Sequence, residues 1–293
     1  MSISDAQILA FARRVRPSSN CTALEARVVD FLKSGPHAES VDELIYGRTV
    51  ETNISDYLID DRRLIVELKA VSGDSAGRVA ALFREALDQE PRMFAVGRMS
   101  IQPILRARAN GEEINSRLVH IAGRAVRQLL QKANKQILAT RDHFEIPNAA
   151  GLVVLAVERG KATEAGVIAY AVRHAIFSEK TPLTGIDYVW VTMENHTIRL
   201  PDGGLGYPEM LIWRRAHRPQ RLEALVGNML DAWSSQQGDE LVHVDHTQGW
   251  DSLSPAETCW RNDLDIYGPS FNRSETGPSP QSGKTRISPT TSS

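Results

Sequence analysis

The stretch that decides the fold is residues 55–70, which reads SDYLIDDRRLIVELKA in one-letter code. Three apolar residues at 57–59 precede a polar run at 60–63, and a second apolar segment follows at 64–66. Two apolar segments joined by a short polar run are typical of a β-hairpin, because strands bury side chains and turns expose them. The sequence therefore predicts two antiparallel strands with a solvated turn between them.

Charge reappears inside the second strand of this hairpin, at Glu67 and Lys69. Residues two apart in a strand lie on the same face of the sheet, so the two side chains are expected to be neighbours. Burying a carboxylate and an ammonium is costly unless they are paired or bind a metal ion. One interpretation is a Glu67–Lys69 ion pair on a half-exposed face. The other adds Asp56 from the neighbouring strand, so that two carboxylates and a lysine converge.

The composition is that of a globular protein. The chain has 293 residues, 42% of them hydrophobic and 24% charged, which suffices for one large domain or two smaller ones. A formal net charge of −2 gives no general attraction to nucleic acid, so any such binding must come from a local patch. The two cysteines, Cys21 and Cys259, show no paired ligand spacing, which favours a reducing cytoplasm. We see neither a signal-peptide pattern nor an apolar run long enough to span a membrane.

The remaining pattern predicts the α/β class, with a central mixed β-sheet flanked by helices. The expected helices span residues 6–14, 23–32, 78–88, 113–140, 163–177 and 218–233. The expected strands, besides the hairpin, span residues 44–53, 94–105, 150–158, 186–191, 196–200 and 210–214. The run at 150–158 is almost continuously apolar, as in a strand buried on both faces, and it begins a βαβ unit.

We expect one α/β domain over residues 1–235, with a core at about 20–160 and an extension at about 160–235. Residues 236–267 are less regular in pattern. Over residues 268–293 Pro, Ser, Thr and Gly dominate, which predicts a disordered tail.

The helix predicted at 113–140 has a polar face of a single charge sign. No acidic residue occurs from Ile114 to Arg141. At 100° per residue, five side chains fall within about 40° of one line along this helix: Arg117, Arg124, Gln128, Gln131 and Lys135. A solvated helix face usually mixes signs, so this stripe favours contact with the phosphates of a polyanion. An ordinary surface helix is the alternative.

This combination of Asp56, the tripeptide Glu67-Leu68-Lys69, a basic helix and a second buried strand resembles the PD-(D/E)XK nuclease superfamily. The resemblance covers roughly residues 20–160 and implies a restriction-endonuclease-like core with the element order αβββαβ. Asp56 matches the first acidic position of the family, and Glu67-Leu68-Lys69 matches its (D/E)XK element. The part of the chain beyond this core is then a C-terminal α/β extension.

The sequence departs from the family pattern in three ways. Ser55 stands where the family has proline, a change that touches no chemistry. The glutamine–tyrosine helix motif of some exonuclease branches is absent, because no Tyr follows four residues after Gln128, Gln131 or Gln136. No feature after Ile186 matches one of the family's features.

The resemblance implies roles for the residues of the hairpin. Asp56, Glu67 and the backbone carbonyl of Leu68 would hold Mg²⁺, a hard cation that prefers oxygen ligands, with Mn²⁺ as its expected substitute. Lys69 would orient or deprotonate the attacking water, or stabilise the developing charge. Glu25 is either a solvated charge or an additional carboxylate near the metal. The expected contacts to the nucleic acid are Arg117, Arg124, Gln128, Gln131 and Lys135.

The predicted function is metal-dependent hydrolysis of phosphodiester bonds in nucleic acid, with DNA as the expected substrate and no membrane partner. The sequence leaves open RNA as substrate, cleavage at ends or internally, and sequence specificity. A homodimer is one expectation, because many relatives dimerise to cut both strands. The alternative function is a catalytically inactive module that binds nucleic acid or protein on the same fold.

Overall fold

The structure is a computed structural model, and it describes residues 6–14, 23–35, 38–47, 53–71, 113, 117, 120, 123–158, 165–177, 182–214, 220–244 and 257–258. The helix predicted at 78–88, the strand predicted at 94–105 and the tail predicted at 268–293 lie outside these residues.

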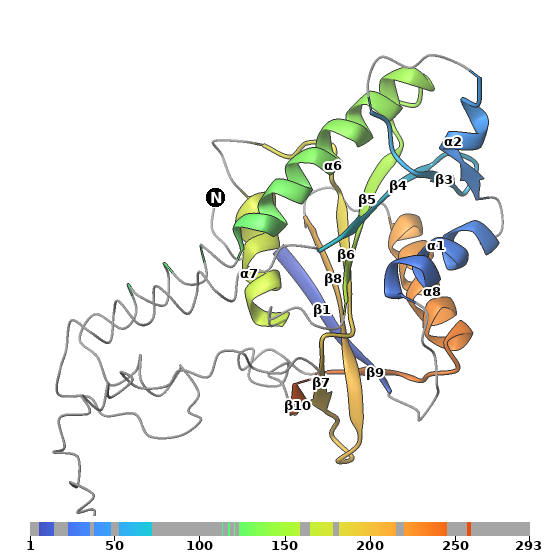
Figure 1. The fold of residues 1–293 in the computed structure, drawn as a ribbon. Coiled ribbons are helices and arrows are strands. Elements are labelled where there is room, and N and C mark those ends of the chain that lie inside the picture. Colours follow the sequence, from blue (N-terminus) through green and yellow to red (C-terminus); the bar gives the residue numbers. More distant parts are fainter. Residues whose placement is uncertain are drawn as a thin grey trace, which may run out of the picture.

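A β-sheet with helices on both faces forms the described part of the chain (Figure 1). The helices are α1 (Leu24–Ser34), α2 (Val41–Leu44), α6 (Arg124–His143), α7 (Ala165–Ile176) and α8 (Gln220–Gln236). The strands are β1 (Ala6–Arg14), β2 (Glu39–Ser40), β3 (Tyr57–Ile59), β4 (Leu64–Ala70), β5 (Ala150–Val157), β6 (Tyr188–Met193), β7 (His196–Arg199), β8 (Leu205–Arg214), β9 (Leu241–His243) and β10 (Glu257–Thr258).

The sheet is mixed. Its strand order is β10-β7-β8-β6-β5-β4-β3-β2, and β1 pairs with β8 and β9. β4, β5 and β6 run parallel, whereas the other pairs are antiparallel. The predicted α/β class and the predicted βαβ unit, formed by β5, α7 and β6, are confirmed. In the described part of the chain no helix has both the length and the apolar character needed to cross a membrane.

The first strand corrects a prediction, because Ala6–Arg14 was expected to be a helix. It is β1, paired with β8 over its full length from Ala6 opposite Arg214 to Arg14 opposite Gly206. Nine residues with scattered apolar positions fit a helical or an extended pattern. The long partner strand supplies a complete backbone ladder, and this tertiary pairing overrides local propensity.

A second correction concerns the strand predicted at 44–53. Its described residues contain the end of helix α2 and a turn at 45–47, and the short strand of this region, β2, lies earlier. The apolar side chains that suggested a strand do not form a buried face, because Tyr46 is 90% exposed. Gly47 has φ 76, a left-handed conformation that suits glycine in a turn.

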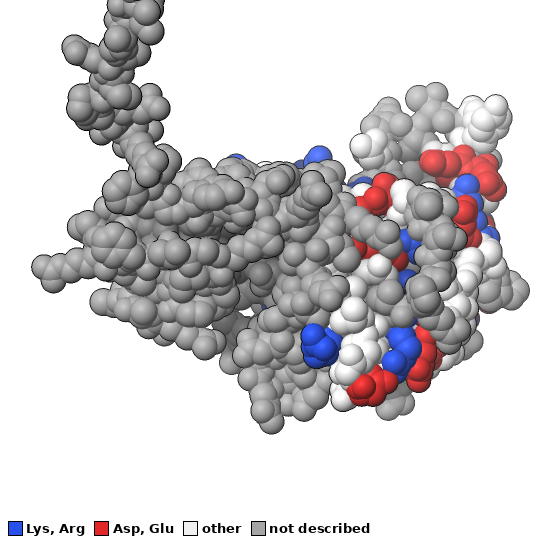
Figure 2. Space-filling model, turned by 60° about the horizontal axis from the view of Figure 1, so that its bottom comes forward, with Lys and Arg blue, Asp and Glu red and all other residues white. Residues whose placement is uncertain are grey.

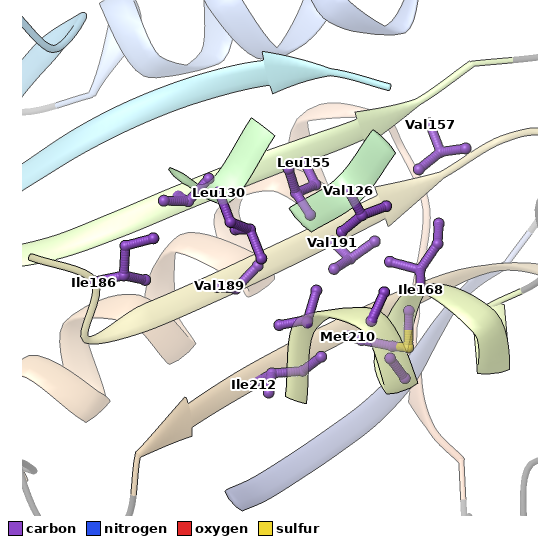
Figure 3. Close-up of a cluster of buried hydrophobic side chains, with 14 of the residues drawn as sticks. Val126, Leu130, Leu155, Val157, Ile168, Ile186, Val189, Val191, Met210 and Ile212 are labelled. Carbon is purple, nitrogen blue, oxygen red and sulfur yellow. The ribbon is translucent and has the colours of Figure 1, made fainter. Parts of the chain in front are cut away.

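Two apolar layers hold the helices to the sheet. α6 and α7 cover one face, and α1 and α8 cover the other (Figure 1). β5 is buried along its whole length, as its apolar run predicts, because it contributes side chains to both layers. The layer beneath α6 and α7 is shown in Figure 3, where the labelled side chains include Val126, Leu130, Leu155, Ile168, Val189 and Ile212.

A network of charged side chains is buried in the layer covered by α1 and α8. Arg13 of β1 is only 2% exposed, and its guanidinium contacts three carboxylates. The distances are 2.6 Å to Glu194, 2.7 Å to Asp239 and 3.2 Å to Glu209 of β8. Buried charges are tolerated when each has an opposite charge and hydrogen-bond donors, and this network meets that condition.

Neighbouring elements complete the network. Arg27 of α1 donates to Glu194 at 2.5 Å, while Trp190 Nε1 and Thr192 Oγ1 of β6 donate to the two oxygens of Glu209 at 2.9 and 2.7 Å. Both oxygens of each of these two glutamates therefore accept hydrogen bonds. The network ties β1, β6, β8 and α1 together.

We expect Arg13→Met to lower the free energy of unfolding by about 3–5 kcal/mol, because it leaves the buried Glu209 without a cation and removes one of the two cations that pair with Glu194. Denaturant-induced unfolding at neutral pH measures the change. Arg14→Met is the matched control, since Arg14 pairs with Asp202 and Glu240 at the surface and should change stability little. Equal losses in the two variants would contradict a special role for the buried network.

Candidate active site

The hairpin of β3 and β4 brings Asp56 and Glu67 side by side. The predicted antiparallel hairpin is present, and its register pairs Tyr57 with Val66. Continuing this register by one residue sets Asp56 opposite Glu67. The two carboxylates that are 11 positions apart in the chain therefore lie on adjacent strands.

The turn between the two strands is also where the sequence placed it. Asp60, Asp61 and Arg62 have φ of 58°, 52° and 63°, the left-handed region that aspartate tolerates better than most residues. The N–H of Arg63 donates to the carbonyl oxygen of Asp60 at 3.1 Å and closes the turn. This turn fixes the register that places the site.

The backbone pairing of the hairpin ends just before β3. There the N–H of Leu68 has no backbone acceptor among the described residues of the neighbouring strand, and the Asp56 carboxylate accepts its hydrogen bond instead. Leu68 N–H donates to Asp56 Oδ2 at 2.7 Å. Ser55 N–H, which would otherwise face Leu68, donates instead to Thr140 Oγ1 of α6 at 2.8 Å. In a strand the N–H and C=O of one residue point to the same side. The carbonyl of Leu68 therefore also points toward the side of Asp56, away from β5.

Helix α6 holds the chain segment that carries Asp56, through two residues that the sequence did not single out. Besides the bond from Thr140 to Ser55, Gln136 Nε2 donates to the carbonyl oxygen of Ile54 at 3.2 Å. Thr140 is buried and is a polar interruption of the apolar face that contains Ile137. That interruption was the one available signal in the sequence.

Glu67 is fully buried, with 0% exposure, and Lys69 Nζ pairs with its Oε1. The predicted ion pair is therefore present, but the expectation of a half-exposed face is wrong for Glu67. Its Oε2 is buried and, within the described part of the chain, accepts no hydrogen bond. The Ser55 hydroxyl lies beside this carboxylate and lowers the pKa of Glu67 as a hydrogen-bond donor, but the geometry between them falls short of a full hydrogen bond. A buried carboxylate oxygen without a partner is costly and marks a place for a cation or water.

The electrostatics of the pair follow from this burial. Burial and the nearby charge of Asp56 raise the pKa of Glu67 to about 7, although Lys69 lowers it. Burial also raises the pKa of Asp56, against the opposing effects of the Leu68 N–H and Lys69. Two carboxyl groups that are buried close together each have a raised pKa, because burial and the neighbouring negative charge disfavour ionisation. A divalent cation bound between them would lower both pKa values.

Glu25 lies near this site without a settled role. Its side chain is exposed, and its backbone N–H donates to Glu158 Oε1 at 3.0 Å, just after the end of β5. Its charge and that of Asp42 both raise the pKa of Asp56, so the Glu25 carboxylate is an electrostatic neighbour of the pair. The two alternatives for Glu25, a solvated charge or an additional metal ligand, both stay predictions.

The donor set of the site suits a magnesium ion. Within the described ranges no group of three or more His, Cys, Asp or Glu side chains is arranged to hold a metal. Asp56, Glu67 and the Leu68 carbonyl offer oxygen ligands only, including the unpartnered Glu67 Oε2. Mg²⁺ retains several waters and typically needs one or two carboxylates, so these oxygens fit it better than they fit zinc.

The polar face predicted on the long helix is exposed on α6. This holds for Arg124, Gln128, Gln131 and Lys135, and Arg117, which precedes α6, is exposed as well. The hydrogen bonds from α6 to the segment before Asp56 come from Gln136 and Thr140 rather than from these five side chains. Among the described residues on the face that Figure 2 shows, acidic and basic side chains are intermixed.

Comparisons with models of protein families, with curated proteins and with solved structures found no match for the chain. The resemblance to the PD-(D/E)XK superfamily therefore stays a prediction carried by Asp56 and Glu67-Leu68-Lys69. Function has to be inferred from the geometry of this site.

The raised pKa of Glu67 predicts how stability depends on pH. The carboxyl has a pKa near 4.5 in the unfolded chain and about 7 in the fold, so folding favours its protonated form. Its contribution to stability is fully present below pH 4.5 and is lost as the pH rises through 7. We expect the metal-free protein to lose up to about 3 kcal/mol relative to Glu67→Gln over this range.

Denaturant-induced unfolding of both proteins in EDTA, at several pH values from acidic to mildly alkaline, measures this difference. Mg²⁺ should stabilise the wild-type protein more strongly above pH 7 than below it, because the ion competes with the proton on Glu67. A pH-independent difference between the two proteins would contradict the burial of an ionisable Glu67.

Proposed function

We propose that the protein is a metal-dependent nuclease that hydrolyses phosphodiester bonds of nucleic acid, with DNA as its substrate. The observation that carries this proposal is the buried Glu67 carboxylate, whose Oε2 has no hydrogen-bond partner among the described residues, beside Asp56 and Lys69. A carboxylate placed only for stability would be fully hydrogen-bonded, as Glu209 is.

The order of the elements supports a restriction-endonuclease-like core. Apart from the short helix α2, the described elements run α1, β2, β3, β4, α6, β5, in agreement with the expected αβββαβ order. β2, β3 and β4 are successive antiparallel neighbours, and β5 lies parallel beside β4. The expected ligands then fall where the hairpin strands separate, a position at which side chains and a backbone carbonyl can share one ion.

In this proposal Asp56, Glu67 and the Leu68 carbonyl hold the metal ion. When bound, Mg²⁺ supplies a Lewis acid that polarises the phosphate and lowers the pKa of water. The chain contributes the placement of these oxygens: the Leu68 N–H fixes Asp56, and α6 fixes Ser55. Burial of Glu67 keeps the site in a low-dielectric environment, where charge interactions are stronger than in water.

Lys69 acts as a hydrogen-bond donor in this reaction. Its ammonium group pairs with Glu67 Oε1 and is partly exposed. It can therefore keep this ion pair and also donate a hydrogen bond to a phosphate at the site. Hydrolysis joins the water oxygen to phosphorus and breaks the ester P–O bond, which adds negative charge to the phosphate oxygens. A fixed cation at that point stabilises the charge as it develops.

Cleavage assays on circular and linear DNA and RNA, with Mg²⁺, Mn²⁺ or EDTA, test the proposal. We expect Asp56→Asn and Glu67→Gln to lower the rate at least about 100-fold, because each removes a charged ligand, and Lys69→Met to lower it comparably. Asp61→Asn is the matched control, since Asp61 is an exposed carboxylate of the hairpin turn. Thermal melting shows whether each variant is folded.

Cleavage retained by a folded Glu67→Gln protein would contradict the assignment. If the wild-type protein binds DNA but does not cleave it with either metal, the inactive binding module is the better description.

A further inference from the structure

The outer surface shared by α6 and α7 combines cations with an exposed aromatic ring. Arg124 and His120 are exposed on the α6 side, where Arg127 is partly buried, and α7 presents Tyr170 and His174. We name these five residues the α6–α7 patch. Tyr170 is 45% exposed, although it is one of the large side chains that proteins usually bury.

The members of the α6–α7 patch share one electrostatic environment. Arg127 Nη2 donates to the carbonyl oxygen of His120 at 2.8 Å. The charges of Arg127, His174 and Arg124 all lower the pKa of His120, and burial lowers the pKa of Arg127. α7 contains no acidic residue, and α6 contains one only at its far end. The two arginines repel each other, and a bound anion would relieve that repulsion.

The aromatic part of the patch consists of two nearly parallel rings. The Tyr170 ring stacks on the His174 imidazole, with centroids 6.1 Å apart and planes 24° apart. Rings of this kind accept nucleic-acid bases, and the stacking is independent of base identity. In a duplex the bases are already stacked on each other, so an exposed ring beside cations fits a single strand.

The position of the patch relates it to the hairpin site. Six residues, 144–149, connect α6 to β5, so the C-terminus of α6 lies near the start of β5. The helix runs antiparallel to β5, and its N-terminal half lies toward the carboxyl ends of β4 and β5 (Figure 1). Lys69 lies at that end of β4. Asp42 and Glu25 add negative charge near Asp56. A polyanion is therefore favoured to approach from the side of α6.

We propose that the α6–α7 patch binds single-stranded DNA and leads it to Asp56 and Glu67, with Tyr170 stacking on a base and the arginines contacting phosphates. This proposal rests on the proposed nuclease function and specifies its substrate class. The patch shares Arg124 with the predicted stripe and adds Tyr170 and His174 of α7.

Fluorescence anisotropy of a labelled oligodeoxythymidylate in EDTA tests binding without cleavage, and a duplex of the same length is measured beside it. We expect the wild-type protein to prefer the single strand. Tyr170→Leu should weaken binding about five-fold or more, and Arg124→Gln should weaken it and reduce its salt dependence.

Two matched variants serve as controls. Tyr46→Leu removes another exposed tyrosine, close to acidic α2, and Arg199→Gln removes an exposed arginine of β7. Both should bind the single strand as the wild-type protein does. Equal affinity for duplex, unchanged binding in Tyr170→Leu and Arg124→Gln, or a Tyr170-dependent dimer in light scattering in place of DNA binding would each overturn the proposal.

Cleavage of the same oligonucleotide with Mg²⁺ separates this proposal from the one on which it rests. Weakened binding in the patch variants, together with normal binding by Glu67→Gln, supports the patch whether or not cleavage occurs. Cleavage that depends on Glu67 but not on Tyr170 or Arg124 supports the nuclease and overturns the patch.

Discussion

The burial of Glu67 is the constraint on which the rest of the site depends. A carboxylate at 0% exposure is tolerated only when nearby groups offset its lost hydration, and Lys69 does this for one of its two oxygens. The other oxygen stays without a partner in the described part of the chain, and Asp56 adds a second negative charge beside it. The hairpin therefore holds a local excess of negative charge in a buried, water-poor environment. The surrounding sheet has to be stable enough to maintain it.

The sheet contains a second buried charged cluster, and the contrast between the two clusters carries functional meaning. Around Arg13 both oxygens of Glu194 and of Glu209 accept hydrogen bonds, so nothing remains for a ligand to satisfy. That arrangement joins distant strands and suits a structural role. The pair formed by Asp56 and Glu67 has the opposite character, with raised pKa values and an unpartnered oxygen. Raised carboxyl pKa values at an incompletely paired site are typical of functional positions.

The sequence could predict what is encoded locally. The hairpin, the buried strand β5 and the face of α1 follow from apolar spacing and turn residues, and Asp56 and Glu67 follow from the register of the hairpin. What could not be predicted depends on distant contacts. β1 is a strand only because β8 pairs with it, and Glu67 is buried only because α6 covers that face of β4. The bond from Thr140 to Ser55 joins residues 85 positions apart, and no local pattern indicates it.

Charge asymmetry around the hairpin limits how the proposed reaction can be ordered. The charges of Asp42 and Glu25 raise the pKa of Asp56, so a phosphate that approaches the metal-free pair meets repulsion from Asp56, Asp42 and Glu25. The α6–α7 patch contains Arg124 and Arg127 and no carboxylate, so the phosphate binding proposed for it would need no metal. On the proposed function, a strand can therefore rest on the patch at any time. A divalent cation held by Asp56 and Glu67 would offset their negative charge, so on this proposal the metal would be needed for cleavage and not for initial binding.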